Sequence, residues 1–142
     1  MKPPLVVVDT NVVVSGLLSS QPQSPPCLVL DGMLEGRFPF LLSLELLSEY
    51  RRVLLRPRIR ERHGLNEDEI DAILTQIVVN GILREARPVP NRAPDEGDDH
   101  LWALLALQPG TVLVTGDQAL IDNPPDSAAV LSPRGFVTLL EA

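Results

Sequence analysis

The sequence lacks several features that particular kinds of protein require. One of its 142 residues is cysteine, so no disulfide can form within the chain, and Cys27 is expected to be a small core residue. The two histidines, His63 and His100, have no cysteine or histidine partner at zinc-site spacing, which argues against zinc. We expect each histidine to line a helix or the surface. The apolar run at the N-terminus is shorter than a signal peptide or a membrane span, so we expect a cytoplasmic protein that does not act on a membrane.

The charges are unevenly distributed along the chain. There are 19 acidic and 12 basic residues, giving a net charge of −7, which at first argues against a polyanionic partner. Six of the twelve basic residues, however, gather in "RRVLLRPRIRER" at 51–62. This cluster either contacts phosphates or forms a solvated helix end that the helix dipole favours. Both interpretations stay open from the sequence.

Short apolar runs alternate with segments of helical periodicity. Strands are expected at 5–9, 38–42, 82–85, 111–115 and 128–131. Helices are expected at 11–20, 25–35, 44–55, 67–80 and 98–108, and again from 133. Because the strong strands are continuous apolar runs, the pattern predicts an α/β fold with a mostly parallel sheet covered by helices on both faces. No repeat or linker divides the chain, so one domain is expected.

Local signals predict where helices begin and which side chains they bury. Asn66 followed by Glu69 resembles a capping box, and Pro57 is expected to end the helix that Ser43 begins. One face of that helix is expected to be apolar, with Leu44, Leu47, Tyr50 and Leu54. Glu45 and Glu49 lie four residues apart on another face, where a salt-bridged helix surface is the simplest interpretation.

Acids follow two of the strongest strands. Asp9 ends "VVVD" and Asp117 ends "LVTGD", and the carboxyl ends of parallel strands meet at the edge of the sheet where sites form. Asp98 and Asp99 precede the apolar residues of a helix that begins at the same edge. Each acid alone has a structural interpretation as a helix cap. Together they would repel unless a cation lay between them, and Mg²⁺ or Mn²⁺ suits oxygen ligands best.

These segments together resemble the PIN-domain family, most closely the small bacterial PIN proteins of toxin–antitoxin pairs, VapC-like in type. The matching segments follow the family's order along nearly the whole chain: "VVVDTNVVVSGLL", "LSLELLSEYRRVLLRPRI", "DEGDDHLWALLAL", "TVLVTGDQALI" and "LSPRGFVTLL". The resemblance implies one PIN domain over residues 1–142, with a three-layer α/β/α, Rossmann-like fold. It also implies a metal-dependent ribonuclease, with a small antitoxin as partner and a homodimer as the assembly.

The resemblance carries a set of four catalytic, metal-binding acids onto Asp9, Glu49, Asp99 and Asp117. Asp98 is the neighbouring candidate for the third position, and Asp95 is a more remote one. The loop has Glu96 and Gly97 where many relatives have Asp-Pro, so we expect its shape to differ from theirs. The reaction would be attack of water on a phosphodiester, with metal ions lowering the pKa of the water and neutralising phosphate charge.

Other residues are expected to support this site. Asn11 either orients a ligand or the attacking water, or acts as a helix cap, and Thr10 adjoins it. Thr115 would supply a hydroxyl behind the ligands. The residues expected to position RNA are Arg51, Arg52 and Arg56.

Two alternative functions fit parts of the sequence. A phosphatase that forms an aspartyl-phosphate needs a second Asp where this chain has Asn11, and Lys2 is its only lysine. A catalytically silent PIN-like module that binds RNA or protein is the stronger alternative. Asn11 and the lack of a downstream lysine disfavour the phosphatase, and the four filled acid positions favour catalysis over the silent module.

Overall fold

The protein is described by a computed structural model that covers residues 2–90, 92–126 and 128–141. Within these residues the strands are β1 (Val6–Val8), β2 (Leu41–Leu42), β3 (Ile82–Leu83), β4 (Val112–Val114) and β5 (Ala129–Leu131). Every ladder is parallel, and the pairing of Val6 with Phe40 joins two small sheets into the order β3-β2-β1-β4-β5. The predicted parallel sheet is therefore confirmed.

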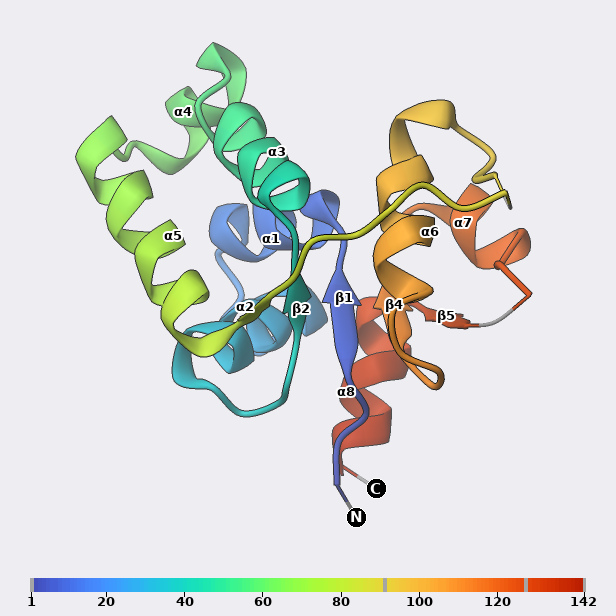
Figure 1. Cartoon of the computed structure of the whole chain (residues 1–142). Helices are drawn as coiled ribbons and strands as arrows, with labels where there is room; N and C mark the ends of the chain where they lie inside the picture. Colours follow the sequence, from blue (N-terminus) through green and yellow to red (C-terminus); the bar gives the residue numbers. More distant parts are fainter. Residues whose placement is uncertain (1, 91, 127, 142) are drawn as a thin grey trace.

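Helices lie on both faces of this sheet. They are α1 (Thr10–Leu18), α2 (Pro25–Glu35), α3 (Leu44–Leu54), α4 (Pro57–His63), α5 (Glu67–Asn80), α6 (Asp99–Leu105), α7 (Gln118–Asp122) and α8 (Pro133–Glu141), with a 3₁₀ turn η1 (Glu96–Asp98) before α6. In Figure 1, α1 and α2 lie behind the strands and α6 lies in front, while α8 packs on α2. The arrangement is the expected three-layer α/β/α fold. In the described ranges, no helix is both long and apolar enough to cross a membrane.

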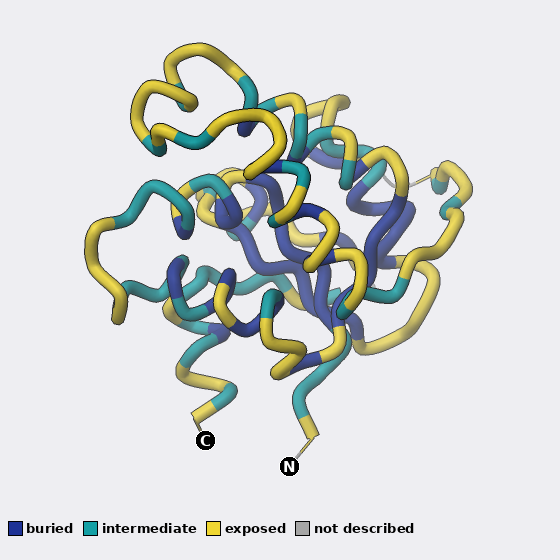
Figure 2. Tube along the Cα trace, turned by 90° about the vertical axis from the view of Figure 1, so that its left-hand side faces the viewer, coloured by how far each residue is buried: buried dark blue, intermediate teal, exposed yellow. Residues whose placement is uncertain are grey.

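The strands occupy the centre of the core. Val6, Val7 and Val8 are completely buried, and burial from both faces explains why the strand sequences are continuous apolar runs. Figure 2 shows these buried segments in the middle of the molecule, surrounded by exposed loops and helix faces. Cys27 is buried as expected, and its thiol donates to the carbonyl oxygen of Gly16 at 3.2 Å.

Most helix ends follow the local sequence signals. Both bonds of the capping box are present, with Glu69 N donating to Asn66 Oδ1 at 2.8 Å and Asn66 N donating to Glu69 Oε1 at 3.1 Å. α3 ends before Pro57 as expected, but Pro57 then opens α4 from the first helical position. The sequence pattern does not predict α4, because none of its residues is buried. It does not predict α7 either, because five residues are too few to show a helical period.

The predicted buried face of α3 is partly wrong. Tyr50 and Leu54 are buried as expected. Leu44, however, is 70% exposed and borders a surface groove, and Leu46 is buried instead. At 3.6 residues per turn, Leu44 lies about 200° around the helix from Leu46. Leu46, Tyr50 and Leu54 follow one another at a spacing of four, so they lie on one face of α3, and this is the face that is buried.

The segment after β3 brings the two halves of the chain together. Residues 84–90 are extended and cross in front of the sheet toward η1 and α6 (Figure 1). Ala86 and Val89 of this segment pack partly buried against the core. This course places α6 beside β1 and α3, so that the acids before α6 reach the edge where β1 ends.

Candidate active site

Asp9 lies directly after β1 and begins α1. Its side chain is buried, with 5% of the residue exposed. Oδ1 accepts from Thr10 N at 2.8 Å, which caps α1, and Oδ2 accepts from Thr115 Oγ1 at 2.8 Å and Asn11 Nδ2 at 3.1 Å. Burial raises the pKa of Asp9, while the bonds from Thr115 and Thr10 oppose that rise. Asp9 is thus a helix cap and also a buried carboxylate held by three donors.

Asn11 and Thr115 join the end of β1 to the end of β4. Asn11 Oδ1 accepts from Gly116 N at 2.8 Å, and Asn11 Nδ2 donates to Thr115 Oγ1 at 3.3 Å as well as to Asp9. A Cβ on Gly116 would lie 3.2 Å from Asn11 Oδ1, so a residue without a side chain suits this close approach. Asn11 therefore bridges two loops, and Asp9 is the cap of α1.

Asp117 lies beside Asp9 through the same network. Its backbone N donates to Thr115 Oγ1 at 3.0 Å, and that hydroxyl donates to Asp9. Its carboxylate caps α7 by accepting from Ala119 N at 2.9 Å. The charges of Glu49 and Asp117 both raise the pKa of Asp9. Acids from β1, β4 and α3 are therefore close enough for their charges to interact.

The carboxylate of Asp99 accepts hydrogen bonds from the loop that precedes it. Its Oδ1 accepts from Ala93 N and its Oδ2 from Arg92 Nη1, both at 2.9 Å. The backbone N–H of Ala93 and the guanidinium of Arg92 lower the pKa of Asp99. The carboxylate of Asp99 is thereby satisfied by its own loop.

Asp98, its neighbour, has the opposite surroundings. Burial and the negative charges of Asp9, Asp95 and Glu49 raise the pKa of Asp98 to about 6, and His100 opposes this rise. The side chain makes no capping hydrogen bond to α6. Of the two adjacent acids, Asp98 is the one whose charge interacts with Asp9 and Glu49.

Glu49 approaches the other acids from α3. Its side chain is 23% exposed, its Oε1 lies 4.0 Å from Arg52 Nη2, and its Oε2 lies 3.2 Å from His100 Nε2. The second contact has an ion-pair distance without hydrogen-bond geometry, so the buried Oε2 has no hydrogen-bond donor among the described residues. The sequence does not predict the contact between Glu49 and His100, because the two residues are 51 positions apart. The only local signal is that His100 directly follows two acids.

Tyr50 also helps to arrange these acids, although the sequence pattern predicts it only as a residue of the apolar face of α3. It is completely buried, and its hydroxyl donates to the carbonyl oxygen of Val8. Burial and the charges of Asp9 and Glu49 raise the pKa of Tyr50, so the hydroxyl keeps its proton. Tyr50 thus fixes α3 against the end of β1 and places Glu49, the preceding residue, beside Asp9.

The donor chemistry of this edge fits a hard divalent cation. Across residues 2–90, 92–126 and 128–141, no three His, Cys, Asp or Glu side chains form a ready-made metal site. The charges of Glu49 and Asp117 nevertheless raise the pKa of Asp9, and the charge of Asp9 raises that of Asp98. Glu49 Oε2 is buried without a donor among the described residues. A cation bound by a few carboxylates, water and phosphate would remove that cost.

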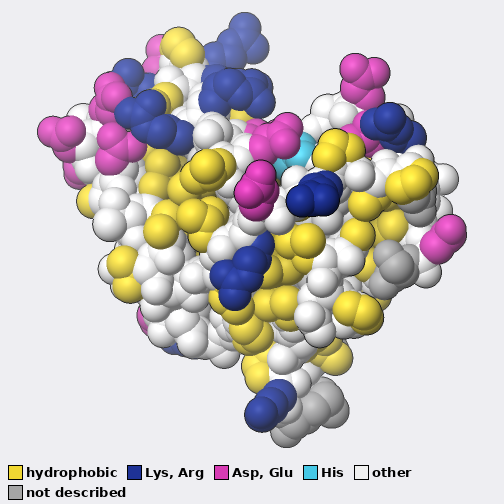
Figure 3. Space-filling view, in the orientation of Figure 1, with side chains coloured by type: hydrophobic (Ala, Val, Ile, Leu, Met, Phe, Trp, Pro, Cys, Tyr) yellow, Lys and Arg dark blue, Asp and Glu magenta, His cyan; other side chains and the backbone are white. Residues whose placement is uncertain are grey.

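The three arginines expected to position RNA have different surroundings. Arg51 is bound to α5, since its Nε donates to Asp71 Oδ1 at 2.8 Å and its Nη2 donates to Glu67. Arg52 is exposed beside Glu49, and Arg56 is exposed at the start of α4. Figure 3 shows acidic side chains beside a histidine in a hollow, with arginine side chains on either side.

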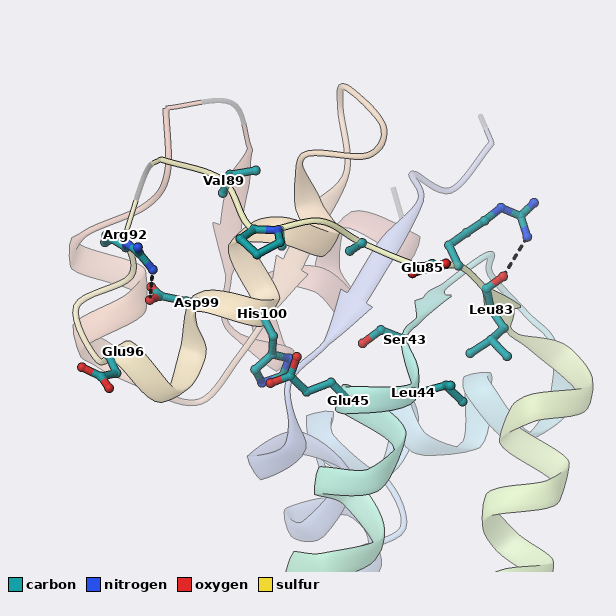
Figure 4. Close-up of a pocket in the computed structure, with 14 residues that line it drawn as sticks. Ser43, Leu44, Glu45, Leu83, Glu85, Val89, Arg92, Glu96, Asp99 and His100 are labelled. Carbon is teal, nitrogen blue, oxygen red and sulfur yellow. Dashed lines mark hydrogen bonds and ion pairs between the residues drawn. The ribbon is translucent and has the colours of Figure 1, made fainter.

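Two grooves meet next to the acids. The larger, about 770 Å³, runs from the end of β3 along the segment before α6, and the smaller, about 430 Å³, lies between Glu49 and Gly97. Glu45 and His100 line both grooves. Figure 4 shows the side chains of these two residues pointing toward each other, with the pair of Arg92 and Asp99 on one side of them and Leu83 and Glu85 on the other.

The comparison with protein families agrees with this architecture. Residues 5–119 match the PIN domain, and the chain belongs to that family. PIN domains are in general nucleases that act on nucleic acid and use divalent metal ions. No curated protein matches the sequence.

Proposed function

We propose that this PIN domain, acting as one unit over residues 1–142, is a ribonuclease that requires Mg²⁺ or Mn²⁺. The observation that carries the proposal is the interaction of Asp9, Glu49 and Asp98, which arrive from separate segments and whose negative charges oppose one another. Such a gathering costs stability without a cation. Carboxylates gathered in this way are expected where they hold a metal ion that acts on a phosphate.

In this proposal Asp9, Glu49, Asp98 and Asp117 hold the cation. The third position, which the resemblance alone assigns to Asp99, is better filled by Asp98, because Asp99 is satisfied by Ala93 and Arg92. Asp99 then has a separate role, in which it anchors the loop before α6.

The remaining polar residues orient these ligands. When bound, the cation lowers the pKa of the attacking water and neutralises charge on the phosphate. Thr115 and Asn11 direct Oδ2 of Asp9 by donating to it at 2.8 Å and 3.1 Å. Because both polar groups of Asn11 are used by protein partners, Asn11 acts on the reaction through Asp9. Thr10 contributes its backbone N–H to the same carboxylate.

RNA would approach from the side of the exposed arginines. Arg52 and Arg56 have guanidinium groups available for phosphate, whereas that of Arg51 is paired with two acids. RNA as the substrate follows from the resemblance to PIN ribonucleases, as do the toxin role, the small antitoxin, the homodimer and the cytoplasmic location. A gene for a small antitoxin beside this one would support the toxin role.

The test is cleavage of a labelled single-stranded RNA by purified protein freed of any partner. We expect cleavage with Mg²⁺ or Mn²⁺, none with EDTA, and a loss of at least ~100-fold in Asp9→Asn. Without cation, Asp9→Asn should melt at the same temperature as the wild type or slightly higher, because a buried charge is removed. Cleavage that persists in EDTA, or in folded Asp9→Asn at the wild-type rate, would refute the mechanism. RNA binding without cleavage would favour the catalytically silent module.

A further inference from the structure

His100 is a buried group that the proposed chemistry leaves unused. It is the second residue of α6, and 8% of its side chain is exposed. Its Nε2 faces Glu49, whereas its Nδ1 is buried without a hydrogen-bond partner among the described residues. A buried nitrogen without a partner is costly. A residue retained only for packing would be better apolar, as the adjacent Leu101 and Trp102 are.

Glu49 is the acid of the site that most needs support. Asp9 and Asp117 each accept a hydrogen bond from a backbone N–H of the helix that they cap. Glu49 projects from the middle of α3 on a longer side chain, and it accepts no hydrogen bond from described residues at its buried oxygen. A glutamate with free rotamers loses conformational entropy each time it binds a cation.

Nitrogen atoms of two side chains flank the Glu49 carboxylate, and the two contacts are not equivalent. Arg52 lies at 4.0 Å from Oε1 with 63% of its side chain exposed, whereas His100 lies at 3.2 Å from Oε2 and is buried. Water screens the exposed contact and not the buried one. His100 also lines both grooves, and Glu49 lines the smaller one. It is therefore the contact that can fix the direction of this carboxylate.

We propose that His100 is a positioning residue that holds Glu49 through the contact between Nε2 and Oε2, so that the carboxylate is prearranged for the cation. The inference rests on the proposed cation-dependent site. It adds a residue that acts on the cation through Glu49, as residues behind metal ligands do when they orient them.

The test measures binding of Mn²⁺ to RNA-free protein by electron paramagnetic resonance. His100→Leu keeps the volume and removes the nitrogen, and we expect it to weaken Mn²⁺ about tenfold. His100→Gln keeps an N–H donor and should stay within about threefold of the wild type. His63→Leu is the matched control, because His63 is bonded to Leu54 O and Leu65 N and should not change Mn²⁺ affinity. Melting temperatures of all the proteins report folding separately.

A double-mutant cycle with Glu49→Gln shows whether His100 acts through Glu49. We expect His100→Leu to have no further effect on Mn²⁺ affinity in the Glu49→Gln background. An equal effect in both backgrounds, an equal loss in His100→Leu and His100→Gln, or unchanged affinity in His100→Leu while the wild type binds Mn²⁺, would overturn the inference alone. A wild-type protein that neither binds Mn²⁺ nor cleaves RNA would overturn the proposed function, and this inference with it.

Discussion

Two groups of carboxylates in this molecule have opposite surroundings. Between α3 and α5, Asp71 accepts from Arg51 Nε at 2.8 Å, and this hydrogen bond lowers the pKa of Asp71. At the sheet edge, burial raises the pKa of Asp9, and the charges of Glu49 and Asp117 raise it further. Ionisation of Asp71 therefore stabilises the folded state, whereas ionisation of the buried Asp9 destabilises it. Ionised carboxylates of the first kind therefore stabilise the fold, whereas ionised carboxylates of the second kind destabilise it.

The same contrast divides two neighbouring residues. Asp99 resembles Asp71, because hydrogen bonds from Ala93 N and Arg92 lower its pKa. Asp98 resembles Asp9, because burial and like charges raise its pKa to about 6. Sequence position does not distinguish the two acids, whereas their surroundings do, and the proposal that Asp98 holds the cation rests on this difference.

The largest expected effect on binding is at Asp9 and Asp117, the two acids of the proposed cation site that follow strands. Asp9→Asn and Asp117→Asn should each weaken Mn²⁺ binding in the absence of RNA by more than about tenfold, since each removes a charged ligand. The paired-acid control Asp71→Asn should leave the affinity unchanged. Calorimetric titration measures all three. If both site variants bind Mn²⁺ as the wild type does, Asp9 and Asp117 do not hold the cation.

The arginines extend the comparison to positive charge. Replacing Arg52 and Arg56 together by alanine should flatten the salt dependence of RNA binding by roughly one unit of slope per lost phosphate contact. Arg51→Ala should leave that slope unchanged and lower the Tm by about 2 °C, because it removes the ion pairs of Arg51 with Asp71 and Glu67 of α5. Fluorescence anisotropy at several salt concentrations gives the slopes. A flatter slope in Arg51→Ala alone would assign Arg51 to the RNA instead.

The smallest effect is on stability against pH without cation. Because the folded-state pKa of Asp98 is about 6 against an ordinary 3.8, the folded state binds the proton more tightly, and stability falls as pH rises through this window. Asp71 and Asp99 have lowered pKa values and act oppositely, losing stability only as pH falls below the ordinary value.

In EDTA, Asp98→Asn should therefore be more stable than the wild type at pH 7, and this advantage should shrink by pH 5. We expect a difference of about 1 kcal/mol or less, because solvent screens the half-buried group. Denaturant titrations at the two pH values measure it. An advantage that grows on acidification would mean that Asp98 is not in a repulsive environment.

Much of the fold was predictable from the sequence because its strongest signals are local. The continuous valine runs predict buried parallel strands, and the capping box at Asn66 and Glu69 forms as the sequence indicates. The wrong prediction that Leu44 is on the buried face of α3 and the failure to predict α4 have one cause. Periodicity indicates only faces that are buried, and it gives no information on exposed helices or on first turns.

The candidate site was predictable only in part. Asp9 and Asp117 follow strands, so the sheet topology alone brings them to one edge. The contact between Glu49 and His100 and the bond from Tyr50 to Val8 depend on how α3 and α6 pack across the sheet. No local pattern encodes that packing. The choice between Asp98 and Asp99 likewise depends on where the preceding loop places the backbone N–H of Ala93.

The measurement that tests the central claim most directly is single-turnover cleavage of one labelled RNA by Asp98→Asn and Asp99→Asn at saturating Mn²⁺. The two substitutions make the same chemical change at adjacent positions, so any difference reports surroundings alone. The account predicts at least ~100-fold slower cleavage in Asp98→Asn and a rate within about threefold of the wild type in Asp99→Asn. The reverse order, or equal rates in the two variants, would contradict the claim that the repelling carboxylates at the sheet edge perform the chemistry.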